Sequence, residues 1–211
     1  MNSQYSGILS ALKKCPLVPV LTIYDVAIAG DLAKALENAG ITVAEVTLRT
    51  PEALDAVKIM KRSTSRLIVG AGTILTKQDV EDVIDAGSDF VVTPATDKHL
   101  CKILTGVKRP VFPGVATASE ALTLYRYGFR YLKFFPAESN GGAAALRSLA
   151  APLTNINFMP TGGITGDTVK DYLACPNVIG VGGSWMIDAS IDRDTNWEAF
   201  TKTVKAAIGQ I

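Results

Sequence analysis

The stretch that decides the fold is Val43-Ala44-Glu45-Val46-Thr47-Leu48-Arg49-Thr50-Pro51-Glu52. Its first six residues read as a β-strand, because apolar and β-branched residues dominate them. Thr50-Pro51-Glu52 then has the composition of a helix start: a threonine N-cap, a proline at the first helical position and an acid in the first turn. A strand that passes directly into a helix is the beginning of a repeating βα unit.

The same unit recurs along the chain in both directions. Amphipathic segments of helix length, such as 26–38, 52–61 and 119–127, separate short apolar runs. Glycine follows helical segments at positions 40, 87 and 128, where helices are expected to end. The eight strand candidates are Leu17–Ile23, Val43–Leu48, Leu67–Gly70, Phe90–Thr93, Pro110–Pro113, Tyr131–Phe135, Asn157–Pro160 and Val178–Val181.

Eight βα units in 211 residues predict an α/β fold, a (β/α)8 TIM barrel that forms one domain over residues 1–211. The spacing of Ile8, Leu9 and Leu12 predicts a short amphipathic helix before the first strand. A doubly wound open sheet is the alternative, although it would use fewer strands. In a barrel, active-site groups come from the carboxyl ends of the strands and from the loops that follow them.

Composition narrows the class of protein. The chain is 48% hydrophobic and has a formal net charge of +1, which provides no electrostatic basis for binding nucleic acid or an acidic membrane. Its three cysteines, Cys15, Cys101 and Cys175, lack CxxC spacing and are expected to be reduced thiols of a cytoplasmic protein. We find no apolar run long enough to span a bilayer and no signal-peptide pattern at the N-terminus.

The single histidine limits the possible chemistry. His99 alone cannot make a His₃ zinc site, and a Ser–His–Asp triad is improbable, so we expect no metal site. The segment Asp97-Lys98-His99-Leu100 resembles the first turn of a helix. We therefore interpret His99 as a surface residue.

Lys133 is the strongest candidate for a catalytic group. It lies inside the apolar run Tyr131-Leu132-Lys133-Phe134-Phe135-Pro136, where a lysine would be desolvated. Desolvation disfavours the ammonium form, and an uncharged amine is a nucleophile suited to Schiff-base chemistry. A lysine at a sheet edge, one that reaches solvent from a strand end, or one in a structural ion pair is the alternative.

Alternation along the second strand places Glu45, Thr47 and Arg49 on one face, opposite Val46 and Leu48. Because apolar residues suit the face covered by helices, we expect Glu45 and Arg49 to point into the barrel. Two interpretations stay open: a structural Glu45–Arg49 salt bridge, or a proton-transfer carboxylate beside an arginine for an anionic substrate.

Glycines follow three strands at the expected carboxyl end. Val69-Gly70-Ala71-Gly72-Thr73 ends the third strand, where small residues would let a ligand approach and Thr73 offers a hydroxyl. Thr161-Gly162-Gly163-Ile164 and Gly182-Gly183-Ser184-Trp185 follow the seventh and eighth strands, which is where barrels commonly bind phosphate. Tight turns are the alternative use of these glycines.

Together these stretches resemble the 2-keto-3-deoxy-6-phosphogluconate (KDPG) and 2-keto-4-hydroxyglutarate (KHG) aldolase family. The matching motifs occur in family order over nearly the whole chain. They are Val18-Pro19-Val20, residues 45–50, Gly70-Ala71-Gly72-Thr73, residues 133–138, Asn140-Gly141-Gly142, residues 160–164 and residues 182–185.

The resemblance implies a class I lyase without metal or other cofactor, a cytoplasmic homotrimer of the Entner–Doudoroff pathway. It would cleave KDPG, a phosphorylated 2-keto acid, to pyruvate and glyceraldehyde 3-phosphate, and could also cleave KHG. Lys133 would form the Schiff base, and Glu45 would be the general acid and base.

The resemblance also assigns substrate-binding residues. Arg49 and Thr73 would hold the substrate carboxylate, and Thr161 would meet a hydroxyl. Gly162, Gly163 and Ser184 would cradle the phosphate. Phe135 would pack against the pyruvyl portion or serve only the core, and the role of Trp185 stays open.

Three alternatives accompany this interpretation. One is an aldolase for the C4 epimer, 2-keto-3-deoxy-6-phosphogalactonate. Another is an epimerase or decarboxylase of phosphorylated substrates, and the third is a non-catalytic phosphosugar-binding barrel. Imine formation with pyruvate would separate the aldolases from the last two.

Overall fold

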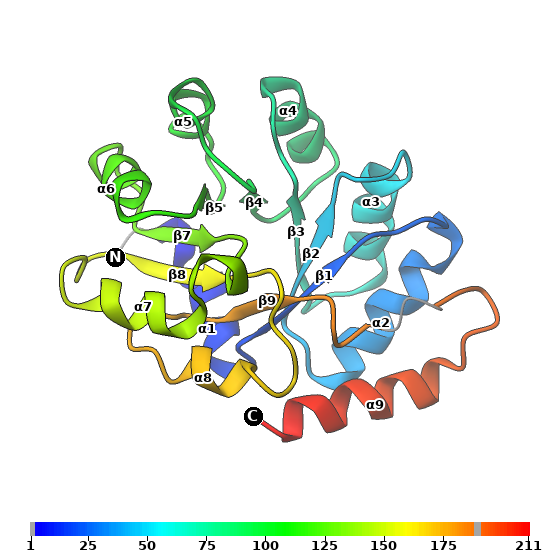
Figure 1. Ribbon diagram of the computed structural model, residues 1–211. Coiled ribbons are helices and arrows are strands. Elements are labelled where there is room, and N and C mark those ends of the chain that lie inside the picture. The colour runs from blue at the N-terminus through cyan, green and yellow to red at the C-terminus, as the bar shows by residue number, and fades with distance from the viewer. Residues whose placement is uncertain (1–2, 188–190) are drawn as a thin grey trace.

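The computed structural model describes residues 3–187 and 191–211, and it has an α/β architecture in which curled parallel strands lie inside a layer of helices (Figure 1). The strands are β1 Leu17–Leu21, β2 Val43–Thr47, β3 Ile68–Gly72, β4 Val91–Val92, β5 Val111–Phe112, β6 Gly114–Val115, β7 Tyr131–Phe134, β8 Asn157–Pro160 and β9 Val181–Gly183. The α-helices are α1 Ser6–Lys14, α2 Ala29–Ala39, α3 Ala53–Ser63, α4 Lys77–Asp85, α5 Lys98–Leu104, α6 Ala118–Arg126, α7 Gly142–Ala150, α8 Val169–Leu173 and α9 Trp197–Gly209. The 3₁₀-helices are η1 Ser3–Tyr5, η2 Val26–Ile28 and η3 Glu138–Asn140.

The strands form two parallel sheets. Six of them pair in the order β5-β4-β3-β2-β1-β9, and three pair in the order β6-β7-β8. Pro113 alone separates β5 from β6, and isolated parallel bridges join Phe158 to Val178 and Thr161 to Gly182. The two sheets therefore approach each other at both of their edges.

Most predicted elements are confirmed, with shifts at their ends. β8 has the predicted bounds, whereas the strand predicted over 178–181 begins three residues later and ends two residues later, as β9. Gly182 and Gly183 are strand residues and not a turn. Glycine suits both positions because neighbouring side chains fill the space that a Cβ would need: Thr161 lies against Gly182, and Trp185 lies against Gly183. The fifth predicted strand, Pro110–Pro113, is found as β5. The short strand β6 was not predicted; it follows Pro113, which has no N–H to give to a sheet ladder.

Helix ends follow the expected chemistry with one exception. Thr117 and Glu120 form a capping box at the start of α6. Thr50, however, does not cap α3: its hydroxyl donates a hydrogen bond of 2.6 Å to the carbonyl of Ile23, and Glu52 occupies the N-cap position. The threonine therefore joins the loop after β1 to the loop after β2.

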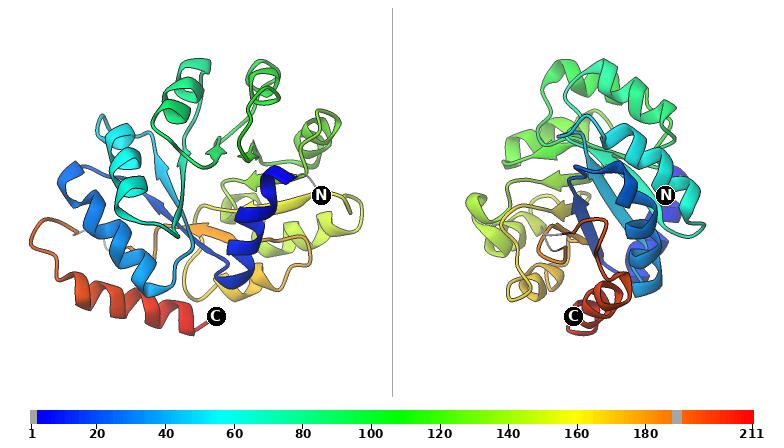
Figure 2. Two further views of the ribbon diagram at one scale, coloured as in Figure 1. Left: turned by 180° about the vertical axis from the view of Figure 1, so that it is seen from behind. Right: turned by 90° about the vertical axis from the view of Figure 1, so that its right-hand side faces the viewer.

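The predicted N-terminal helix is confirmed as α1, and it lies in front of the strands in the left view of Figure 2, which shows the molecule from behind. Before it, the hydroxyl of buried Tyr5 donates to the carbonyl of Val111 at 2.8 Å. Thr42, just before β2, donates to the carbonyl of Ala11 at 2.9 Å. These contacts set η1 and α1 against the amino ends of the strands, so the opposite, carboxyl ends are left for a site.

The core has an outer and an inner part. The larger cluster packs the helices on the strands and includes Leu32, Val57 and Leu146. A smaller one, with Tyr5 and Phe112, fills the inside near the amino ends of the strands.

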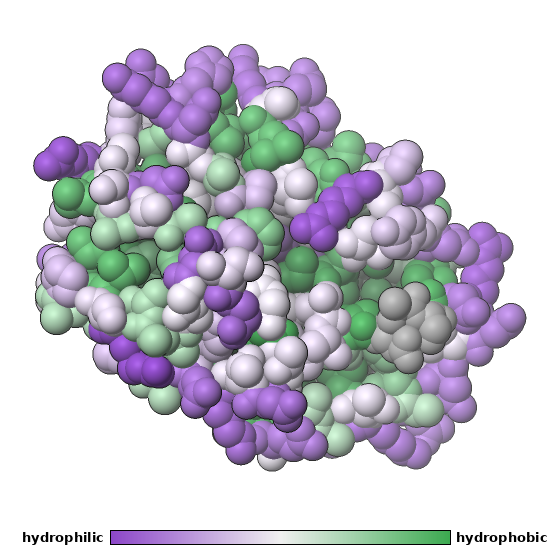
Figure 3. All heavy atoms as spheres, viewed as in Figure 1, coloured by the Kyte–Doolittle hydropathy of each residue, from purple (hydrophilic) through white to green (hydrophobic). Residues whose placement is uncertain are grey.

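Hydrophilic side chains gather at the rim of the face in Figure 3. Within the described ranges no helix is long and apolar enough to cross a membrane.

Candidate active site

A lysine and a glutamate meet in the interior. Lys133 is the third residue of β7 and is 4% exposed, and Glu45 is the third residue of β2 and is 0% exposed. Lys133 Nζ donates to Glu45 Oε1 over 3.0 Å. Since β2 and β7 belong to different sheets, the interior faces of both sheets contribute to this pair. Lys133 is thus neither an edge residue nor one that reaches solvent.

Gly72 makes room for this carboxylate. A Cβ built on Gly72 would lie 1.9 Å from Glu45 Oε1, a distance that no real side chain tolerates. A Cβ on Gly70 would lie 2.3 Å from the ring of Phe90. The glycines of β3 therefore admit protein side chains, and our expectation that they admit a ligand is wrong for these two positions.

Two buried polar atoms of predicted site residues lack partners in the described part of the chain: Glu45 Oε2 and Thr161 Oγ1. Thr161 is 5% exposed and follows β8 directly, next to Gly182 of β9. Buried polar atoms are nearly always hydrogen-bonded, so each of these two atoms calls for an external partner. A ligand with hydroxyl or carboxylate groups would satisfy both.

Phe135 lies beside Lys133. The Lys133 Nζ is 5.3 Å from the centroid of the Phe135 ring, and the ring is half-buried. A Cβ on Gly162 would lie 3.1 Å from Phe135 Cε2, so the ring packs on the backbone of the loop after β8. This aromatic surface joins the lysine to that loop.

Thr73 has an unusual backbone. Its φ is +64°, the left-handed region, and among the described residues it is the one non-glycine with positive φ. A β-branched residue is strained in that region, and such strain clusters at functional sites. The half-buried Thr73 directly follows Gly72, so the strained residue lies next to the glycine that accommodates Glu45.

The two glycine pairs behave differently. Gly162 and Gly163 have φ of +101° and +79° and form a turn after β8. Gly183 lies in β9, where a Cβ would be 1.7 Å from the Trp185 ring. Trp185 therefore packs on the strand backbone. Ser184 is exposed and lines a cavity of about 590 Å³ beside Thr22 and Ile23.

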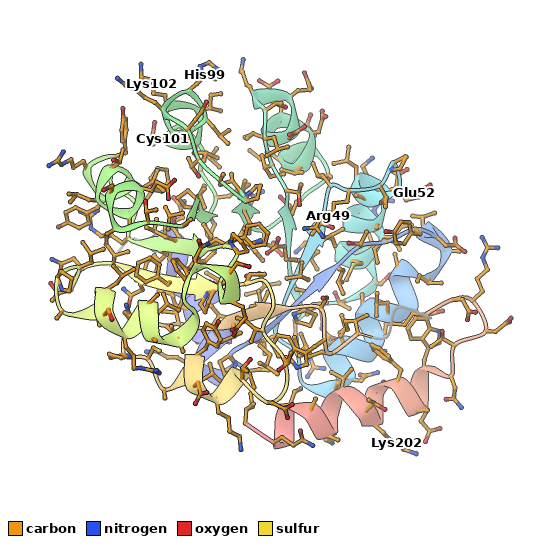
Figure 4. All side chains as sticks on the ribbon, in the orientation of Figure 1. Arg49, Glu52, His99, Cys101, Lys102 and Lys202 are labelled. Carbon is orange, nitrogen blue, oxygen red and sulfur yellow. The ribbon has the colours of Figure 1, made fainter. Side chains whose placement is uncertain are left out.

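Arg49 departs from its predicted place. β2 ends at Thr47, and the Arg49 N–H turns back to the Thr47 carbonyl at 2.8 Å, so the alternation that pointed Arg49 inward stops before it. Arg49 is exposed beside the carboxyl end of β2 (Figure 4) and makes no ion pair with any described residue. The predicted alternative of a Glu45–Arg49 salt bridge is wrong, because Glu45 pairs with Lys133.

Other residues that stand out in the sequence lie away from the site. His99 and Lys102 extend from the outer side of α5 in Figure 4, and His99 is exposed. The three cysteines are free and buried. Over residues 3–187 and 191–211, no three His, Cys, Asp or Glu side chains come together as a metal ion would require.

Sequence reasoning missed two contributors. The close fit between Gly182 and Thr161 comes only from the bridge that joins β8 to β9. Thr22, whose hydroxyl lies 3.1 Å from that of Thr47, is placed by the register of β1 on β2. Neither pairing is visible in a local pattern, because each depends on how strands far apart in sequence align.

Comparison with known proteins agrees with this geometry. Residues 8–203 match the family model for KDPG and KHG aldolase. A KHG/KDPG aldolase of Escherichia coli K12 is 39% identical over 199 residues, which cover 94% of this chain and 93% of that protein. A 2-dehydro-3-deoxy-phosphogluconate aldolase of Zymomonas mobilis is 42% identical over 85% of this chain and 86% of its own length.

A solved structure agrees over a similar span. The KDPG aldolase of Legionella pneumophila, with pyruvate captured as a covalent carbinolamine intermediate, superposes with a TM-score of 0.89 and 35% identity over 94% of this chain and 97% of that one. Sequence and backbone thus agree along almost the whole length, and the chain belongs to the KDPG/KHG aldolase family.

Proposed function

We propose that this protein is a class I aldolase that cleaves KDPG to pyruvate and glyceraldehyde 3-phosphate, and that it also cleaves KHG. The observation that carries the proposal is the buried amine of Lys133, held 3.0 Å from the carboxylate of Glu45. An amine beside a proton acceptor can become a neutral nucleophile without leaving the interior. The relatives named KHG/KDPG aldolase support this choice of substrates.

The first step joins the substrate to Lys133. The neutral amine attacks the C2 carbonyl to form a carbinolamine, which loses water to give a protonated imine. Glu45, in hydrogen-bond contact with Nζ, accepts the proton that the ammonium must lose before attack and returns it to the carbinolamine hydroxyl that leaves as water, so Glu45 is a carboxylate again. The positive imine then withdraws electrons from the bond between C3 and C4.

Glu45 then serves in both directions. It takes the proton of the C4 hydroxyl, directly or through water, as the C3–C4 bond breaks and the electron pair enters the imine to leave an enamine. Glyceraldehyde 3-phosphate departs, Glu45 returns a proton to C3, and water releases pyruvate from Lys133. The unpartnered Oε2 of Glu45 supports this role, since it leaves one carboxylate oxygen for substrate or water.

The remaining predicted residues would hold the substrate. Arg49 and Thr73, at the carboxyl ends of β2 and β3, would bind the carboxylate. The unpartnered hydroxyl of Thr161 would meet a substrate hydroxyl, and Phe135 would cover the pyruvyl carbons. We assign the phosphate to Gly162 and Gly163 with Ser184, across the gap between β8 and β9. A solved Zymomonas mobilis relative, 38% identical with a TM-score of 0.89, holds 3-phosphoglycerate.

We also propose that the two sheets close into one (β/α)8 barrel. The short separation of β5 and β6 by Pro113 and the bridges between β8 and β9 support closure. The homotrimer and the cytoplasmic location, in the Entner–Doudoroff pathway, stay proposals. Three buried free thiols suit a reducing compartment, and light scattering of the purified chain would test the trimer.

Borohydride reduction in the presence of pyruvate tests the chemistry. We expect a stable pyruvyl adduct on Lys133, mapped by peptide mass, and none in Lys133→Arg, whose guanidinium cannot form the imine. Lys61→Arg is the control, since Lys61 is a half-buried, ion-paired lysine outside the site. An adduct on another lysine would reject the assigned nucleophile, and no adduct at all would favour a phosphate-binding barrel that is not an aldolase. Turnover of KDPG against its C4 epimer separates the two aldolase alternatives.

A further inference from the structure

Glu138 lies under the turn that follows β8. We call this turn, residues 161–163, the glycine loop. Glu138 N–H donates to the carbonyl of Gly162 at 3.0 Å, and the N–H of Ala137 donates to that of Thr161 at 2.8 Å. A Cβ on Gly163 would lie 2.8 Å from Glu138 Cβ and 2.9 Å from its Cγ. The backbone and the aliphatic stem of Glu138 therefore support the glycine loop from below.

The carboxylate of Glu138 is turned away from that loop. Tyr172 donates its hydroxyl to Glu138 Oε1 over 2.6 Å. A Cβ on Gly142 would lie 3.4 Å from the Tyr172 hydroxyl and 3.5 Å from Glu138 Oε2, so both groups occupy the space beside Gly142. In this way the stem of Glu138 lies against the loop while its head is held beside α7.

Tyr172 is a buried hydrogen-bond donor. It is 1% exposed on α8, the helix that follows the glycine loop along the chain. Burial, and then the hydrogen bond to the Glu138 carboxylate, raise the pKa of Tyr172, so the phenol keeps its proton and stays a donor. A short bond from a neutral donor to a carboxylate is among the stronger hydrogen bonds in proteins.

We propose that Glu138 and Tyr172 are positioning residues for phosphate binding: their hydrogen bond fixes the stem of Glu138 under Gly163 and holds a negative carboxylate away from the phosphate cradle. The inference rests on the proposed function, since it presupposes a phosphorylated substrate at the glycine loop. Neither residue touches the reacting carbons. Loss of the hydrogen bond between Tyr172 and Glu138 would let the Glu138 stem move, and it would also let the negative Glu138 carboxylate approach and repel a phosphate.

Tyr172→Phe tests this with a phosphorylated and an unphosphorylated substrate. We expect KM for KDPG to rise about three- to tenfold, the range set by the loss of one such hydrogen bond, with kcat changed less than about twofold. KM for KHG, which carries no phosphate, should not change. The inhibition constant of inorganic phosphate against KHG cleavage should rise by the same factor as KM for KDPG.

Two further variants keep the test decisive. Glu138→Gln retains an oxygen that accepts the hydrogen bond from the Tyr172 hydroxyl, so the ratio of its KM for KDPG to its KM for KHG should stay near that of the wild type. Glu138→Ala should raise the ratio, and it carries the test if Tyr172→Phe does not fold. Tyr5→Phe is the matched control, because Tyr5 also buries a hydroxyl that donates a hydrogen bond, but at the amino ends of the strands.

The outcomes separate the two proposals. If Tyr172→Phe and Glu138→Ala leave both KM values unchanged, or raise them together, the positioning role is overturned while pyruvate trapping on Lys133 still supports the aldolase. If the wild type neither traps pyruvate nor cleaves KDPG, the proposed function itself fails, and this inference fails with it.

Discussion

Lys133→Met removes one half of the buried ion pair while keeping a side chain of similar length. At the observed Nζ–Oε1 distance of 3.0 Å, the attraction between two unit charges is about 5 kcal/mol for an effective dielectric of about 20. The variant would leave the Glu45 charge with no partner at 0% exposure. Breaking a buried pair in this way costs about 3–5 kcal/mol. We expect the free energy of unfolding to fall by that amount at neutral pH.

The double variant Lys133→Met/Glu45→Gln has no buried charge. A buried ion pair can be replaced by uncharged side chains of similar size at little cost. We therefore expect its free energy of unfolding to lie within about 1 kcal/mol of the wild type, so most of the single-variant loss is recovered. With Glu45→Gln, the four proteins form a complete double-mutant cycle whose coupling energy reports the pair itself.

Urea unfolding followed by circular dichroism measures these free energies. Lys61→Met is the control: Lys61 lies 2.6 Å from Asp89, closer than Lys133 to Glu45, but the two side chains are 31% and 30% exposed. Solvent screening limits its cost to about 1 kcal/mol. The reasoning is refuted if Lys133→Met is as stable as the wild type, or if the double variant is no more stable than Lys133→Met.

Two other predictions concern the site and its support. Gly72→Ala places a methyl 1.9 Å from Glu45 Oε1, and the displaced carboxylate should lower kcat by about 100-fold or more in steady-state assays, whereas Gly7→Ala, with open space around its Cβ, should not. Because the pKa of Tyr172 is raised, the stability it contributes is complete below the unfolded pKa of about 10 and is lost as pH rises toward the folded pKa. Above pH 10 the wild type should therefore lose up to about 1.4 kcal/mol per pH unit more than Tyr172→Phe in urea unfolding, and equal losses would contradict this.

Local patterns were enough to predict much of this fold. Apolar runs between helix signals located the strands, and the spacing of Ile8, Leu9 and Leu12 predicted the N-terminal helix that the structure contains as α1. Lys133 stood out because a lysine inside an apolar strand contradicts its surroundings, and its burial is confirmed. These features depend only on residues near one another in the chain.

The rest depends on long-range alignment. Nothing local says that Lys133 meets Glu45, since the contact requires β2 and β7 to face each other from different sheets. Alternation failed at Arg49 because β2 ends two residues earlier. β9 was displaced in our prediction because glycines carry no strand signal; close packing by Thr161 and Trp185 is what makes them suitable there.

The junction between β8 and β9 has a consequence for motion. Two isolated bridges join the two sides here, one from Phe158 of β8 to Val178 and one from Thr161 to Gly182 of β9, whereas β2 and β3 are aligned at five residue pairs. Weakly paired segments open locally more often than the rest of a protein. An anion bound across this junction would hold its two sides together, so amide hydrogen exchange along β9 would slow as the site fills. The rate of amide hydrogen exchange along β9 would therefore measure how much substrate is bound at this junction.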